Sequence, residues 1–174
     1  MRSFARLAPV AAAMLIAVPL AAQTPDITVP PRPLIGFSGG ISIPAGGVSK
    51  TQQSGFNLGA LAEYHAPGEA LGVRGELNFE QFSKKQDALK SRSATELTIN
   101  ALYDIPGYAF RPYFIGGMGF YHLSEQGNHP GFNVGTGVNI PLTGFTAHME
   151  MRVHWAMTDG PSFVTVPISF GVEF

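Results

Sequence analysis

Residues 163–174 (FVTVPISFGVEF) alternate without a break between apolar side chains and side chains that are mostly small or polar. Successive side chains of a β-strand point to opposite faces, so this stretch predicts a strand with one apolar and one polar face. The apolar face ends on an aromatic residue and consists of Val164, Val166, Ile168, Phe170, Val172 and Phe174. Such a face is typical of the last strand of a transmembrane β-barrel, which faces lipid and closes the sheet against the first strand.

Seven further segments alternate and are separated by turn residues: 34–44, 55–65, 71–82, 93–105, 111–123, 131–140 and 145–156. Each is long enough to cross a hydrocarbon layer as a tilted strand. Segment 111–123 is apolar on both faces, and there we expect Phe114, Met118 and Phe120 outward and Tyr113, Gly117, Gly119 and Tyr121 inward. The sequence therefore predicts an all-β fold, an eight-stranded antiparallel up-and-down transmembrane β-barrel over residues 34–174. A soluble lipocalin-like barrel is the alternative, and it would reverse the two faces.

The connections between the predicted strands differ in length. They are short after the second, fourth and sixth segments, and mostly longer after the first, third and fifth (AGGVSKTQQS, SKKQDALKSR and SEQGNHP). Short periplasmic turns and longer extracellular loops are the arrangement of outer-membrane barrels. We therefore expect both termini of the chain on the short-turn side of the barrel, in the periplasm.

The N-terminus predicts export. Arg2 and Arg6 precede an apolar run and the small residues Ala21 and Ala22, which is the pattern of a signal peptide over residues 1–22, cleaved between Ala22 and Gln23. A membrane anchor is the alternative, but the run is short and contains two prolines. Residues 23–33 are rich in proline, and we expect them to form an extended periplasmic segment that precedes the barrel. We expect the mature protein in the cell outer membrane.

Composition excludes several kinds of chemistry. The chain of 174 residues has no cysteine, a formal net charge of −1 and only 13% charged residues. It therefore has no disulfide framework, and its charge gives no argument for nucleic-acid binding. We expect no cofactor.

The inward faces of the predicted strands collect most of the charges. These residues are Glu63, Arg74, Glu76, Glu80, Glu96, Asp104, Glu150, Arg152 and Glu173. Buried charges must be paired or hydrated, and a barrel of this size is just wide enough for its own side chains. We expect a polar plug in which the arginines are shared among the acids. Because the acids outnumber the arginines, a narrow cation-preferring pore remains the alternative.

No catalytic or metal site is predicted. His148 and His154 share a face of one strand with Glu150, but the two histidines lie about 20 Å apart and cannot share a metal ion. The cations Lys84, Lys85, Lys90 and Arg92 are placed in a loop, where they could meet lipid phosphates.

The chain resembles the small outer-membrane β-barrel proteins of the OmpA-like and opacity type. The stretches that carry the resemblance are RPYFIGGMGFYHL (111–123), GFNVGTGVNIPL (131–142) and the terminal PISFGVEF. The resemblance implies insertion by the barrel assembly machinery, which would read Ile168, Phe170, Val172 and Phe174. His122 and Ser124 also resemble the His-x-Ser element of outer-membrane lipid A deacylases, but Glu125 stands where those enzymes have asparagine.

We therefore expect an integral outer-membrane protein, not an enzyme, with a structural or loop-mediated adhesion role. Its partners would be outer-membrane lipid and the assembly machinery, and the sequence does not identify a loop partner. A narrow pore and an outer-leaflet lipid A-modifying enzyme are the alternatives.

Overall fold

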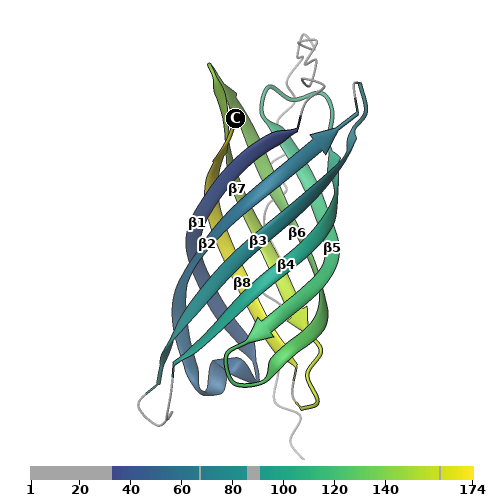
Figure 1. Cartoon of the computed structure of the whole chain (residues 1–174). Helices are drawn as coiled ribbons and strands as arrows, with labels where there is room; N and C mark the ends of the chain where they lie inside the picture. The colour runs from purple at the N-terminus through teal and green to yellow at the C-terminus, as the bar shows by residue number, and fades with distance from the viewer. Residues whose placement is uncertain (1–32, 67, 86–90, 161) are drawn as a thin grey trace, which may run out of the picture.

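The computed structural model describes residues 33–66, 68–85, 91–160 and 162–174, and the predicted signal peptide lies outside them. The described chain forms a closed barrel of eight antiparallel strands (Figure 1), which confirms the predicted fold class. The strands are β1 Leu34–Gly46, β2 Gln52–His65, β3 Leu71–Lys84, β4 Arg92–Asp104, β5 Arg111–Leu123, β6 Gly127–Leu142, β7 Phe145–Ala156 and β8 Phe163–Glu173, with a short 3-10 helix η1 at Val48–Lys50. The described residues contain no helix that is long and apolar enough to cross a membrane.

Each strand pairs with its neighbours in sequence, and β1 pairs with β8 to close the barrel. The closure continues past the end of β8. The backbone N–H of Phe174 donates to the carbonyl of Ile35 at 2.9 Å, and the N–H of Ile35 donates to the carbonyl of Phe174 at 3.1 Å. The start of β1 and the end of β8 therefore lie at the same end of the barrel (Figure 1).

The outside of the barrel carries the large apolar side chains. Residues such as Phe37, Leu77, Leu97 and Met151 are exposed, while the side chains between them point inward. The expected faces of β5 are confirmed: Phe114, Met118 and Phe120 are exposed, whereas Tyr113 and Tyr121 are fully buried. A soluble barrel would bury these apolar residues. The faces are therefore those predicted for a transmembrane barrel, and not those of the soluble alternative.

The predicted connections are too long, and the strands run further than expected. β2 begins at Gln52 instead of residue 55, and β6 begins at Gly127 instead of residue 131. Residues 124–126 alone join β5 to β6, and Gly127 turns with φ 83°. The prediction placed the strand ends where the apolar face stops, but the backbone hydrogen bonds continue beyond that point because the pairing of main-chain groups does not depend on which side chains face outward.

The two ends of the barrel nevertheless differ. At the end where β1 meets β2, β3 meets β4 and β5 meets β6, the strands continue past the apolar surface with outward polar residues, here called the polar hairpin ends: Gln53, Gln81, Ser83, Thr95, His122 and Asn128. At the opposite end, exposed apolar residues such as Tyr64, Leu71 and Tyr103 lie next to the turns. The asymmetry that the sequence assigned to loops therefore resides in extended hairpins.

The apolar surface has aromatic edges. Phe132 and Trp155 stack with ring centroids 5.1 Å apart near the polar hairpin ends, and Phe145 and Phe174 lie 6.2 Å apart at the other edge. From Phe145 to Trp155 the apolar row of β7 is about 33 Å long, or about 25 Å high at a tilt of about 40°. That height matches the apolar band of outer-membrane barrels.

Candidate functional site in the barrel interior

The strands direct a set of ionisable side chains into a narrow interior. All nine acids and arginines that the sequence placed inside are buried: Glu63, Arg74, Glu76, Glu80, Glu96, Asp104, Glu150, Arg152 and Glu173. Four histidines, His65, His129, His148 and His154, are buried as well. Their inward direction follows from the strand alternation, but their partners lie on other strands and depend on barrel closure.

Arg74 is the centre of one cluster. It is fully buried, its Nη1 lies 2.8 Å from Glu150 Oε2, and its Nε donates to Glu63 Oε2 at 2.6 Å. Its Nη2 lies 3.4 Å from Glu173 Oε1, and its guanidinium lies 5.4 Å from the centre of the Tyr113 ring. The Tyr113 hydroxyl donates to Glu150 at 2.7 Å. These contacts tie β2, β3, β5, β7 and β8 together through one side chain.

Arg152 is the centre of a second cluster. Its two terminal nitrogens contact both carboxylate oxygens of Glu76, at 2.5 and 2.6 Å, and its Nε lies 2.6 Å from Glu150 Oε1. Asn100 donates to the same Glu76 carboxylate at 2.7 Å. Glu150 therefore bridges the two arginines. The closest approach of Arg74 to Glu76, on its own strand, is 3.9 Å.

Arg74 and Arg152 are shared among Glu63, Glu76, Glu150 and Glu173, and they do not reach the other three acids. Asp104 pairs instead with Arg111, Nη1 to Oδ2 at 3.4 Å. Glu80 and Glu96 have no ion pair with an arginine or lysine among the described residues. His65 and His148 are paired with Glu63 and Glu173 at 2.9 and 3.0 Å. The sequence did not include these two histidines among its site residues.

Inward glycines make room for the large interior side chains. Tyr113 lies across from Gly137 in the β5–β6 register, and Arg152 lies across from Gly135 in the β6–β7 register. A side chain at Gly137 would overlap the Tyr113 phenol, and one at Gly135 would overlap the Arg152 stem. The glycines of β6 are therefore part of the interior packing.

Apolar residues close the interior on both sides of the charged clusters. Val48, Phe82, Ala94, Tyr121, Leu123, Ala156 and Phe163 form one buried group beneath the polar hairpin ends, here called the apolar cap. Leu102, Tyr113 and Ile115 form a second group towards the opposite end. Between them lies a small space lined by Asn57, Asn78, Glu80, Glu96, Glu150, Arg152, His154, Pro167 and Ser169.

The other residues singled out from the sequence lie on the surface. Ile168 and Val172 are half-buried and Phe170 and Phe174 are exposed on the outside of the barrel. Lys84 and Arg92 belong to strands β3 and β4, which corrects their placement in a loop, and Lys90 lies outside the described residues. Arg92 Nε lies 3.3 Å from Glu125 Oε2, and Lys85 Nζ contacts the carbonyl of Ser49.

His122 and Ser124 do not form a nucleophile–base pair. The His122 Nδ1 lies 2.7 Å from Asn128 Oδ1, and the Ser124 hydroxyl accepts from the backbone N–H of Ser93 at 3.2 Å. A serine nucleophile needs a base within hydrogen-bond reach. The arrangement of these two side chains is that of a polar hairpin surface.

Known proteins resemble the chain in fold. No family model matches the sequence, and no curated protein sequence matches it. Neisserial surface protein A is similar with a TM-score of 0.64 at 15% identity, over 81% of this chain and 95% of that one. The outer membrane protein OprG of Pseudomonas aeruginosa is similar with a TM-score of 0.53 at 15% identity, over 81% and 95%. A major outer membrane protein of Thermus thermophilus is similar with a TM-score of 0.53 at 15% identity, over 82% and 98%. The chain thus has the fold of the small eight-stranded outer-membrane β-barrels, and the predicted resemblance is confirmed at that level.

Proposed function

We propose that the mature chain is an integral protein of the bacterial outer membrane whose closed barrel holds polar hairpin ends outside the cell. The observation that carries the proposal is the outer surface, where large apolar residues are exposed on all the strands, for example Phe37, Leu58, Leu97, Met118 and Phe170. A continuous apolar surface of this extent marks contact with lipid or with another protein. Its height and aromatic edges favour lipid.

The role we propose is structural or adhesive, without transport or catalysis. The bidentate pairing of Arg152 with Glu76 and the four-acid surroundings of Arg74 occupy the middle of the interior. The apolar cap closes the side beneath the hairpins. A conducting path would need these buried pairs to separate. Each buried charge that loses its partner costs several kcal/mol.

The polar hairpin ends are the surface available to a partner. They carry Lys84, Arg92, Gln53 and Thr95 on the paired strands β2, β3 and β4, and Lys85 directly follows β3. Rigid display is how binding segments are held on a stable scaffold. Cations at this surface would also meet the lipid phosphates of the outer leaflet.

Insertion would depend on β8, whose outward residues Ile168, Phe170, Val172 and Phe174 are those that we propose the barrel assembly machinery reads. Export would use the signal peptide expected over residues 1–22. The orientation that we propose places the first residue of β1 and the last residue of β8 in the periplasm.

Membrane fractionation combined with heat-modifiable gel mobility tests the proposal. We expect the chain in the outer-membrane fraction after alkaline washing, migrating faster unboiled than boiled because the intact barrel resists detergent. Recovery in the soluble periplasmic fraction, with one mobility in both samples, would contradict it. A planar-bilayer recording adds the test of closure, and steady cation-selective channels would contradict a closed interior.

A further inference from the structure

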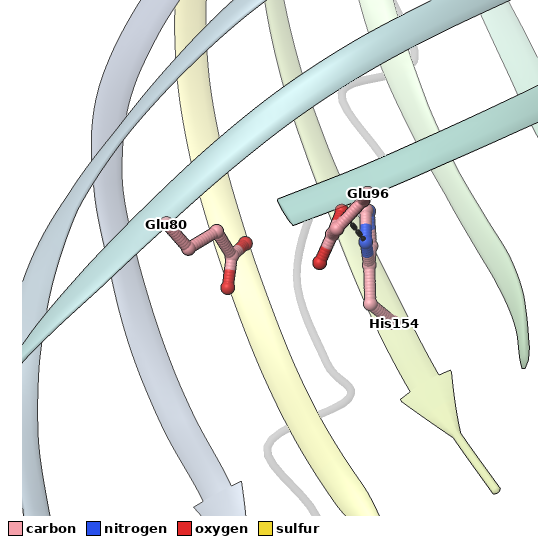
Figure 2. Close-up of side chains that lie close together, drawn as sticks. All are labelled: Glu80, Glu96 and His154. Carbon is pink, nitrogen blue, oxygen red and sulfur yellow. Dashed lines mark ion pairs between the residues drawn. The ribbon is translucent and has the colours of Figure 1, made fainter. Parts of the chain in front are cut away.

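A separate group of side chains lies between the Arg152 cluster and the apolar cap. Glu80 from β3, Glu96 from β4 and His154 from β7 point toward one another in the interior (Figure 2), and one ligand atom of each lies within 4.8 Å of the others. The three side chains are 1%, 0% and 2% exposed. Because β4 and β7 are not neighbours in the sheet, this meeting occurs across the barrel interior.

Five of the six carboxylate and imidazole polar atoms of this group lack hydrogen bonds. Among the described residues, Oε2 of Glu80, both carboxylate oxygens of Glu96 and both ring nitrogens of His154 have none. His154 Nδ1 lies 2.7 Å from Glu96 Oε2, the ion pair drawn in Figure 2, but the two atoms are not aligned as donor and acceptor. Buried polar atoms are nearly always paired with protein, water or an ion. The three side chains therefore have unused ligand capacity directed at one point.

The charge of the group is also unbalanced. Arg152 is the nearest inward neighbour of His154 on β7, but all three of its nitrogens contact Glu76 or Glu150. Glu80 and Glu96 thus face one imidazole and no arginine or lysine among the described contacts. Buried carboxylates are normally paired, protonated or bound to a metal. A divalent cation would balance both carboxylates at once.

We propose that Glu80, Glu96 and His154 bind a divalent transition-metal ion of the Zn²⁺ type inside the barrel. Two carboxylates and one imidazole are suitable ligands for such an ion, with bonds of about 2.0–2.2 Å. Ligand atoms on one tetrahedral ion lie about 3.3 Å apart. Binding would therefore bring the Glu80 carboxylate closer and would move His154 Nδ1 and Glu96 Oε2, now 2.7 Å apart, slightly away from each other. The Tyr121 ring packs edge-on against the His154 ring at 5.9 Å and holds the imidazole toward the site.

The position of the group determines how the ion would enter. The next inward residues toward the hairpins on the three strands are Phe82, Ala94 and Ala156, and all belong to the apolar cap. On the other side lies the Arg152–Glu76 pair. The ion would therefore be captured during folding and exchange slowly afterwards. Its role would be structural, tying β3 and β4 to β7 in the part of the interior that the arginines do not cross-link.

The competing explanation is a carboxyl pair that shares a proton beside His154, with no metal. Refolding into detergent with Zn²⁺ distinguishes the metal site from the proton-sharing carboxyl pair. The wild-type chain, Glu96→Gln and His154→Gln are refolded with Zn²⁺, washed with chelator and analysed for bound zinc. The control is His148→Gln, because His148 is buried on the same strand face but pairs with Glu173. Heat-modifiable mobility shows which samples contain folded barrel.

We expect the wild type and His148→Gln to retain about one zinc per chain, and the two ligand variants to lose affinity by about tenfold or more. We also expect the wild-type unfolding midpoint to rise when Zn²⁺ is present during refolding. Absence of zinc in the folded wild type, or equal zinc in folded His154→Gln, would overturn the proposal. If the ligand variants do not fold, the wild-type chain is refolded with Co²⁺ in place of Zn²⁺ and its visible absorption spectrum is recorded. Visible absorption of a low-symmetry cobalt site supports the proposal, and the spectrum of aqueous Co²⁺ overturns it.

Discussion

Arg152 on β7 and Glu76 on β3 meet across the barrel interior, with the two terminal guanidinium nitrogens 2.5 and 2.6 Å from the two carboxylate oxygens. The residues are 76 positions apart in the chain, and their strands are not neighbours in the sheet. Because both side chains are buried, removing Arg152 takes away the closest positive charge of Glu76 and leaves it with Asn100 and with Arg74 at 3.9 Å.

Arg152→Ala is therefore expected to destabilise the barrel by about 3–5 kcal/mol, measured as the free energy of unfolding in urea and detergent. The matched control is Arg92→Ala, which removes a partly exposed pair with Glu125 and should cost about 0–1 kcal/mol. Equal small losses in both variants would mean that the interior is hydrated, as in the pore alternative.

Gly137→Ala is expected to destabilise the barrel by about 1–3 kcal/mol, because the added methyl group would overlap the buried Tyr113 ring. The control is Gly75→Ala on the outside of β3, where no atom lies within 4 Å of the added carbon. That change should be neutral or stabilise by about 0.5–1 kcal/mol, since glycine is unfavourable in strands. Thermal unfolding of the two variants measures the difference, and a reversed order would place the β6 glycines outside the packed interior.

Leu77→Arg tests whether the middle of the outer surface lies in lipid. Leu77 is 53% exposed near the centre of the apolar row of β3, and arginine at the bilayer midplane costs about 2–4 kcal/mol. Thr95→Arg places the same side chain on a polar hairpin end, where the cost should be about 0–1 kcal/mol. Folding in lipid vesicles followed by urea titration gives both values. Similar values for the two variants would argue against a lipid-facing row.

Deletion of Phe174 is expected to reduce the amount of folded protein in the outer membrane. It removes an exposed aromatic side chain and the two backbone hydrogen bonds to Ile35 that finish barrel closure. Phe174→Ala keeps the backbone bonds and removes only the aromatic ring, so it separates recognition of the ring from closure. Wild-type amounts of heat-modifiable protein in both variants would contradict a role of Phe174 in barrel assembly.

The alternation of side chains was enough to predict the strands and their faces, even in β5. There Gly117 and Gly119 weaken the pattern, but Tyr113 and Tyr121 share their face with them and are buried. The ends of β2 and β6 could not be predicted, because outward residues such as Gln53 and Asn128 carry no apolar signal while the backbone still pairs. The Glu80–Glu96–His154 group was missed for another reason. Strand parity gives the face of a residue, but it does not give the height at which distant strands meet across a closed barrel.

The single tryptophan of the chain allows the most direct test of the lipid-facing barrel. Trp155 lies on the outer face of β7, stacked on Phe132 at the edge of the apolar surface near the polar hairpin ends. Its fluorescence is measured in bilayers of brominated and ordinary lipid, and again with acrylamide in the water. We predict strong quenching by brominated lipid and little by acrylamide. Strong quenching by acrylamide, with no effect of the brominated lipid, would show that this surface does not face the membrane and would contradict the proposal.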